Sequence, residues 1–308
     1  MDKNISLIKK YWLYSKERFP ILPVLLYSGA VFYAACFFVS FFGQPSFSFI
    51  QTLPGWATLF LVTLHLRLLD EHKDYEKDLK AHPDRLLSKG IISLKELRIL
   101  FWIVLGIEIL INAFWGISRI AFWGALFLWS LLMFKEFFIG KFLEKRIGLY
   151  LFSHQILVIF LGFYALSFFM DFNLFNPKIF PFSLLYLFGI MCFTMTYEIA
   201  RKTWSHDREH EFADSYTKSW GIPGTFIITQ IIALAAGGIF YYFLIAAGVS
   251  LVSLFIIGGS YFLFLLTEIL FVIKPTLKNS KTLEISSMLF VLASLISSAV
   301  TFYNHSSF

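Results

Sequence analysis

Three aspartates recur at a spacing of four residues, at Asp70, Asp74 and Asp78. In a continuous helix this spacing stacks the carboxylates one turn apart on one face, where like charges repel each other. A divalent cation would offset this repulsion, and Mg²⁺ commonly combines one or two carboxylates with water and phosphate oxygens. The spacing therefore indicates a face that could bind Mg²⁺ against a diphosphate. The alternative is a solvated helix end in which Lys73 and Lys77 pair with the acids.

A cationic turn follows the aspartates. Residues 82–90 (HPDRLLSKG) should end the helix, and they include Arg85 and Lys89. Guanidinium and ammonium groups donate charge-assisted hydrogen bonds, so both side chains could bind phosphate oxygens opposite the acidic face. Ser93 and Glu96 then have the spacing of a capping box, which predicts that another helix begins there.

A second acid-rich segment extends from Glu198 to Asp214, and it contains the basic pair Arg201 and Lys202. The basic pair could bind a diphosphate directly, or Lys202 could pair with Glu198 one helical turn earlier. The charge pattern alone favours an ordinary solvated loop.

The elements that must position these residues are membrane-spanning helices. Of the 308 residues, 58% are hydrophobic and 15% are charged, and the mean hydropathy is +0.71. This composition is too apolar for a water-soluble domain. Lipid offers no partner for unpaired backbone groups, so each apolar stretch of about 20 residues should be a helix. The sequence thus predicts an all-α integral membrane protein with nine spans, near residues 20–43, 52–69, 97–115, 119–139, 149–170, 180–200, 223–245, 248–273 and 283–303.

The basic residues predict the orientation of these spans. Residues 1–19 form a basic arm without the apolar core and cleavage site of a signal peptide. With this arm in the cytoplasm, Arg119 and Lys178 are the only basic residues outside, as the positive-inside rule requires. The carboxyl terminus is then outside, and the charged connections 67–98 and 201–218 are cytoplasmic loops that could form an active site. We expect a single transmembrane domain over residues 1–308, with anionic lipid headgroups rather than nucleic acid as partners of its net charge of +6.

The first acid-rich block resembles a signature of the UbiA-type intramembrane prenyltransferases, which join a polyprenyl diphosphate to an acceptor, often aromatic. That signature reads Asn-Asp, two residues, Asp, three residues, Asp, followed by Pro, Arg-Pro and Gly at fixed offsets. The matching residues are Asp74, Asp78, Pro83, Arg85 and Gly90. Asp70-Glu71 stands in place of Asn-Asp and keeps oxygen ligands, whereas Leu86 replaces the second Pro.

The second segment resembles the family's second signature in its position after the sixth span. Its Glu-Ile-Ala-Arg-Lys run, residues 198–202, is similar to a subgroup whose motif reads Glu-Ile, one residue, Arg-Lys. The resemblance implies a Mg²⁺ cofactor with ligands at Asp70, Glu71, Asp74, Asp78, Glu198, Asp207 and Glu209. It implies catalytic roles for Asp74, Asp78, Arg85 and Lys202, and substrate-binding roles for Arg85, Lys89, Arg201 and Lys202.

Lys135 resembles the Lys of a family motif that reads Tyr, three residues, Lys. Leu131 replaces the Tyr, and a plain positive-inside anchor is the alternative. On this resemblance Lys135 is a further candidate for binding the diphosphate.

Several polar residues lie within apolar spans, where ionisable groups usually face a cavity or a partner. Glu108 and Asn112, one turn apart, could line a substrate pocket or form interhelical hydrogen bonds. The same two alternatives apply to Glu268. For His65, a role in helix packing is favoured over a position in the wall of the pocket. Cys36 and Cys192 should be small core residues.

The resemblance implies a UbiA-like bundle with a central cavity and Mg²⁺-dependent transfer of a polyprenyl group. The expected partners are a polyprenyl diphosphate, a small acceptor that is by preference aromatic, and membrane lipids of an inner or plasma membrane. Lipid or quinone biosynthesis is the expected setting. The alternatives are a transporter that uses Glu108 and Glu268, and a non-catalytic isoprenoid-binding protein with the same fold.

Overall fold

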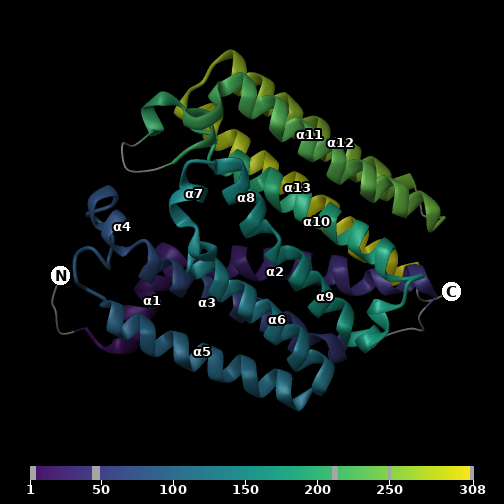
Figure 1. Cartoon of the computed structure of the whole chain (residues 1–308). Helices are drawn as coiled ribbons and strands as arrows, with labels where there is room; N and C mark the ends of the chain where they lie inside the picture. The colour runs from purple at the N-terminus through teal and green to yellow at the C-terminus, as the bar shows by residue number, and fades with distance from the viewer. Residues whose placement is uncertain (1–4, 44–48, 210–213, 249–250, 306–308) are drawn as a thin grey trace.

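The computed structural model describes residues 5–43, 49–209, 214–248 and 251–305 (Figure 1). Within these ranges the chain is helical and contains no strand. Nine of the described segments are long and apolar enough to cross a membrane, which confirms the predicted fold class. They are formed by α2 and η1 (Ile21–Phe37, Phe38–Phe42), α3 (Phe49–Lys73), α5 (Leu94–Phe114), α6 (Ile117–Phe134), α8, α9 and η3 (Ile147–Gln155, Leu157–Met170, Asp171–Phe175), α10 (Phe180–Arg201), α11 (Tyr216–Ala246), α12 (Leu251–Ile273) and α13 (Leu277–His305).

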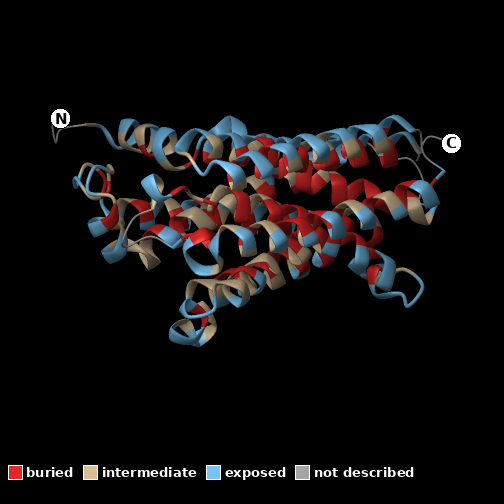
Figure 2. Cartoon of the chain, turned by 90° about the horizontal axis from the view of Figure 1, so that it is seen from above, coloured by how far each residue is buried: buried red, intermediate tan, exposed pale blue. Residues whose placement is uncertain are grey.

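The centre of the bundle consists of α2, α9, α10 and α13. α13 packs against α2, α10 and α12, while α2 packs against α9. On one side α3, α5 and α6 complete the bundle, and on the other side α11 and α12 do (Figure 1). Figure 2 shows the buried residues concentrated along the middle of this arrangement. Buried serines of α13, such as Ser287, Ser294 and Ser298, allow neighbouring helices to approach closely.

Short helices gather at one end of the bundle. They are α1 (Leu7–Arg18), α4 (Tyr75–Ala81) and α7 (Gly140–Glu144) (Figure 1). The predicted continuous helix through Asp78 is interrupted at Asp74, where φ is −96° and ψ is 9°. The amides of Asp74 and Asp78 still donate to the carbonyls of Asp70 and Asp74, at 2.9 and 2.8 Å. The three aspartates therefore remain one turn apart across the bend.

A buried polar network connects α3, α5, α6 and α9. Nδ1 of His65 lies 2.9 Å from a carboxylate oxygen of Glu108, and the Trp123 indole donates a 2.9 Å hydrogen bond to the other oxygen. One turn along α5, Asn112 accepts a 2.7 Å hydrogen bond from the Tyr164 hydroxyl. Glu108 and Asn112 are 0% and 1% exposed. They thus form the interhelical hydrogen bonds that the sequence leaves open as the alternative to lining a pocket.

A second network lies on the opposite side of the bundle. Glu268 of α12 accepts a hydrogen bond from the Gln230 amide, and the Tyr261 hydroxyl donates to Gln230 at 2.8 Å. Cys36 and Cys192 are buried and unpaired, as predicted.

Replacing Glu108 with Ala should strand the buried His65 and Trp123 donors. Each of the two stranded donors costs about 1–3 kcal/mol, so we expect Glu108→Ala to lower the free energy of unfolding by about 2–6 kcal/mol in an SDS titration in bicelles. Glu284→Ala is the control, because the 3.0 Å pair of Glu284 with Arg208 is partly exposed and should contribute less than about 1 kcal/mol. Equal losses in the two variants would contradict the assignment.

Candidate active site

Both acid-rich segments lie at the end of the bundle that carries α1, α4 and α7 (Figure 1). Lys77 of α4 forms a 3.0 Å ion pair with Asp214, so the two segments touch. His154 of α8 lies within electrostatic range of Lys73 on one side and of Lys202 and Glu198 on the other. The structure therefore brings the first segment, the second segment and α8 around one region.

Of the four predicted Mg²⁺ ligands in the first segment, Asp70 and Asp74 remain available. The Asp70 side chain is 50% exposed and lies 4.0 Å from the Lys73 ammonium group. Among the described residues, the Asp74 carboxylate makes no ion pair or side-chain hydrogen bond. Burial raises the pKa of Asp74 above its ordinary value; Lys73 opposes this shift and the Asp78 carboxylate adds to it.

The other two predicted Mg²⁺ ligands of this segment already hold arginines. Glu71 is 2% exposed and accepts hydrogen bonds from Arg18 at 2.8 Å and from Arg67 at 2.7 Å. Asp78 pairs with Arg85 and lies 3.4 Å from Arg18. Glu71 and Asp78 were predicted as Mg²⁺ ligands, but here their oxygens neutralise cations.

Helix α1 contributes residues that the sequence analysis did not identify. Arg18 bridges Glu71 and Asp78, and the Tyr14 hydroxyl lies 3.5 Å from Glu71. Burial and the Glu71 carboxylate raise the pKa of Tyr14, so the hydroxyl stays protonated. The sequence carries one signal for this contact, the basic character of the arm that contains Arg18. That character predicts the orientation of the arm but not its contact with Glu71 and Asp78.

The second segment pairs its own charges. Glu198 lies 2.6 Å from Arg201 and 3.2 Å from Lys202, one turn later on α10. The Glu209 carboxylate accepts hydrogen bonds from the hydroxyls of Ser215 and Thr217, at the start of α11. Two predicted Mg²⁺ ligands are thus engaged by other groups.

The remaining predicted residues show no contact with Asp70 or Asp74 in the part of the chain that the structure describes. Asp207 is exposed in η4 (His206–Arg208). Lys89 pairs with Asp84 at 3.4 Å on the surface. The Lys135 ammonium group lies 5.1 Å from the centre of the Phe134 ring.

Tyr150 and His154 are further residues that the sequence analysis missed, and they form a cluster with Lys73, which was considered there only as a partner of the acids. The Lys73 ammonium group donates a 3.1 Å hydrogen bond to the Tyr150 hydroxyl and lies 4.0 Å from Glu136. The Tyr150 and His154 rings stack at 4.0 Å. No motif or spacing predicted this cluster, because it joins α3 to α8 only through the folding of the bundle.

The side chains that could ligate a metal ion determine which kind of metal site this region can form. Among the described residues, no three His, Cys, Asp or Glu side chains come together as a metal cage. Mg²⁺ shared with a diphosphate needs only one or two carboxylates, the rest being water and phosphate oxygens. Asp70 and Asp74, with the second carboxylate desolvated and unpaired, fit such a shared ion and do not form a stand-alone protein site.

A strained turn borders the Lys73 cluster. In η2, the three residues Glu136, Phe137 and Phe138 have φ values of 49°, 53° and 59°. Such left-handed backbone costs about 1–2 kcal/mol per residue other than glycine. At Gly140, an added Cβ would clash with a carboxylate oxygen of Glu136. Gly140 is therefore needed for the Glu136 carboxylate to rest where it does.

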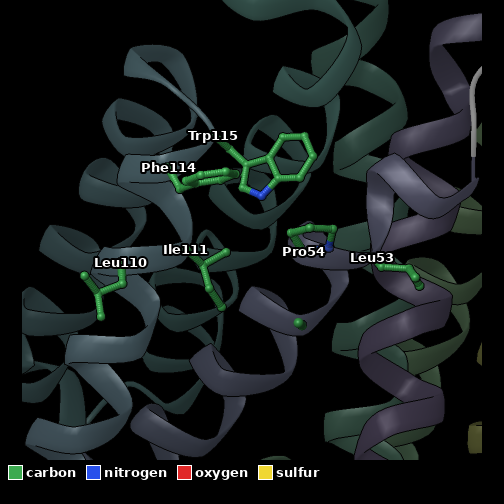
Figure 3. A pocket seen from close by; sticks show the side chains of 7 residues that line it. Leu53, Pro54, Leu110, Ile111, Phe114 and Trp115 are labelled. Carbon is green, nitrogen blue, oxygen red and sulfur yellow. The ribbon is translucent and has the colours of Figure 1, made fainter.

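An apolar groove lies at the opposite end of α3 (Figure 3). It has a volume of about 650 Å³ and is lined by Leu53, Pro54, Ala57, Leu110, Ile111, Phe114 and Trp115. It contains no charged side chain and is separated from Asp70 by most of the length of α3. The groove is therefore a surface suited to lipid chains and is not part of the acidic region.

Two solved structures share this architecture. One is the apo form of a UbiA homologue from Aeropyrum pernix K1, at 15% sequence identity and a TM-score of 0.62, over 88% of this chain and 96% of that chain. The other is from a study of digeranylgeranylglyceryl phosphate synthase in membranes, at 15% identity and a TM-score of 0.59, over 96% and 99% of the two chains. No family model and no curated protein matches the chain by sequence. The similarity confirms that the chain has the predicted UbiA-like fold.

The raised pKa of Asp74 predicts a pH dependence of stability. In the metal-free protein, the Asp74 carboxyl group binds a proton more tightly in the folded chain than in the unfolded chain. Protonated Asp74 therefore contributes stability at low pH, and this contribution is lost as the pH rises through the raised pKa. We expect Asp74→Asn to raise the melting temperature of the metal-free protein at neutral pH and to flatten its decline with pH. Asp207→Asn, at an exposed acid, should change neither property. A lower melting temperature for Asp74→Asn at neutral pH would contradict this account.

Proposed function

We propose that this protein is a Mg²⁺-dependent prenyltransferase, which transfers a polyprenyl group from its diphosphate to an acceptor at the membrane boundary. The observation that carries the proposal is the convergence of an available acid pair, Asp70 and Asp74, with cations of both segments at one end of a UbiA-like bundle. A solved structure with this fold concerns a digeranylgeranylglyceryl phosphate synthase, which is consistent with the proposal.

Asp70 and Asp74 are the residues that would hold Mg²⁺. Bound there, the ion would neutralise charge on the diphosphate and make it a better leaving group. Asp78 remains associated with Arg85, so this acid positions a cation beside the metal face. We assign Glu71 the same kind of role toward Arg18 and Arg67.

Arg201 and Lys202 would bind the diphosphate from the side of the second segment. In the structure Glu198 holds both cations, and one turn of helix separates it from Lys202. A diphosphate carries more charge than one carboxylate, so it can compete for these cations and leave Glu198 as the group that keeps them in place. With Arg85 and Lys73, these residues would stabilise the charge that develops as the carbon–oxygen bond breaks.

The position of the site suits a substrate with two chemically different ends. The diphosphate would stay at the charged end of the bundle, with the polyprenyl tail between apolar helices. We propose that this end, with both charged loops, faces the cytoplasm and that residues 1–308 act as one domain, since the basic residues collect there. The proposed acceptor is a small, by preference aromatic, molecule of lipid or quinone biosynthesis.

Turnover tests the proposal directly. Purified protein with Mg²⁺ and labelled geranylgeranyl diphosphate should release diphosphate or transfer label into a lipid extract. Asp74→Asn should lower this rate about 100-fold or more, as expected when charge stabilisation of the leaving group is lost. Glu76→Gln, at an exposed acid of the same helix, is the matched control. No turnover by the wild-type protein, together with donor binding unaffected by Asp74→Asn, would rule out the enzyme.

The role of the basic pair has a separate test. Lys202→Ala should raise the KM for the donor diphosphate about ten- to hundredfold, because a charge-assisted hydrogen bond is lost. Lys145→Ala, at an exposed lysine of the same end, should leave the KM unchanged. If both variants weaken donor binding equally, general positive charge rather than Lys202 binds the diphosphate.

A further inference from the structure

The strained turn after α6 holds one aromatic ring between two helices. Phe137, at φ 53°, packs its ring edge-on against the Trp129 indole of α6 at 5.2 Å and the His154 imidazole of α8 at 5.8 Å. Two backbone hydrogen bonds, Phe138 to Lys135 at 2.9 Å and Ile139 to Glu136 at 3.0 Å, close the turn. Left-handed backbone at bulky residues persists only where its surroundings require it, and such strain concentrates at ligand clamps.

Both neighbours of the Phe137 ring carry a buried polar atom without a partner. Trp129 Nε1 and His154 Nε2 make no hydrogen bond among the described residues. His154 Nδ1 lies 2.8 Å from the Tyr150 carbonyl oxygen, which can only accept, so Nδ1 carries the proton. In the neutral ring, Nε2 is then an acceptor, whereas the indole Nε1 is a donor. A buried donor and a buried acceptor thus flank one phenyl ring.

We propose that the space filled by Phe137 is a subsite for a small planar molecule with a hydroxyl group, and that Phe137 closes it when no such molecule is bound. A hydroxyl group is both an acceptor and a donor, so it can pair with either atom: it accepts from Trp129 Nε1 and donates to His154 Nε2. The strain of the turn lowers the cost of moving Phe137 out. On the proposed function, this molecule is the acceptor.

A chain of contacts connects the subsite to the acid pair. Tyr150, which stacks on His154 at 4.0 Å, accepts the hydrogen bond of Lys73, and Lys73 lies 4.0 Å from both Asp70 and Glu136. A ring in place of Phe137 is therefore connected to the diphosphate region through His154, Tyr150 and Lys73.

Binding of p-cresol, measured by ligand-observed NMR, tests the subsite, because the ring of p-cresol matches that of Phe137. The methyl ether of p-cresol is the control probe, since it lacks the hydroxyl donor. Phe137→Ala should bind p-cresol at least about tenfold more tightly than Phe138→Ala, the control at the exposed neighbour in the same turn (79% exposed). In the Phe137→Ala background, Trp129→Phe and His154→Phe should each weaken binding about three- to tenfold. Wild-type protein should prefer p-cresol over the ether, and His154→Phe should remove that preference.

Equal binding to the Phe137→Ala and Phe138→Ala variants, or equal binding of p-cresol and its ether, would overturn the proposal. Trp129→Phe and His154→Phe each remove a ring nitrogen but keep an aromatic ring. The test needs only one of these variants to retain the wild-type melting temperature. Mg²⁺-dependent binding of geranylgeranyl diphosphate, measured on the same variants, should be unchanged. If wild-type protein shows no Mg²⁺-dependent binding of geranylgeranyl diphosphate but still prefers p-cresol over its ether, the prenyltransferase is refuted and the subsite is not.

Discussion

A lipid bilayer cannot solvate charge, and this constraint determines where the ionisable side chains of this protein lie. Within the spans, Glu108 and Glu268 are buried and hydrogen-bonded to groups of neighbouring helices. At the charged end of the bundle most carboxylates are matched by cations, as Glu71 is by Arg18 and Arg67. Asp74 differs from these acids, since its carboxylate is desolvated and has no hydrogen-bonded partner among the described residues. On the proposed function, a metal ion bound there would supply the missing positive charge.

Helix α1 links the amino-terminal arm to that arrangement. Arg18 contacts two acids of the first segment, and the Glu17 carboxylate accepts a 3.1 Å hydrogen bond from the Leu86 amide in the turn that carries Arg85. The arm therefore helps to fix both the acidic face and the turn that follows it. Arg18 of this arm thus contributes to the candidate site.

Features that depend on local sequence were predictable. The nine spans followed from apolar length, and the capping box of Ser93 and Glu96 forms as expected. The pairing of Lys202 with Glu198 was one of two alternatives that helical spacing allowed. Contacts between distant segments were not predictable: the Lys73–Tyr150 hydrogen bond and the bridge made by Arg18 depend on how the helices pack. The resemblance implied a Mg²⁺ role for Glu71, but Arg67 one turn earlier on α3 and Arg18 of α1 pair with this carboxylate in the structure.

The central claim is that the acid pair binds a metal ion together with a diphosphate. The most direct measurement is a calorimetric titration of the wild-type protein with a non-hydrolysable geranylgeranyl thiolodiphosphate, with and without Mg²⁺. Because coupling between two ligands is reciprocal, Mg²⁺ should tighten binding of the analogue, and the analogue should tighten binding of Mg²⁺ by the same factor. In Asp74→Asn this mutual tightening should disappear. An analogue affinity that is the same with and without Mg²⁺ in the wild-type protein would contradict the account.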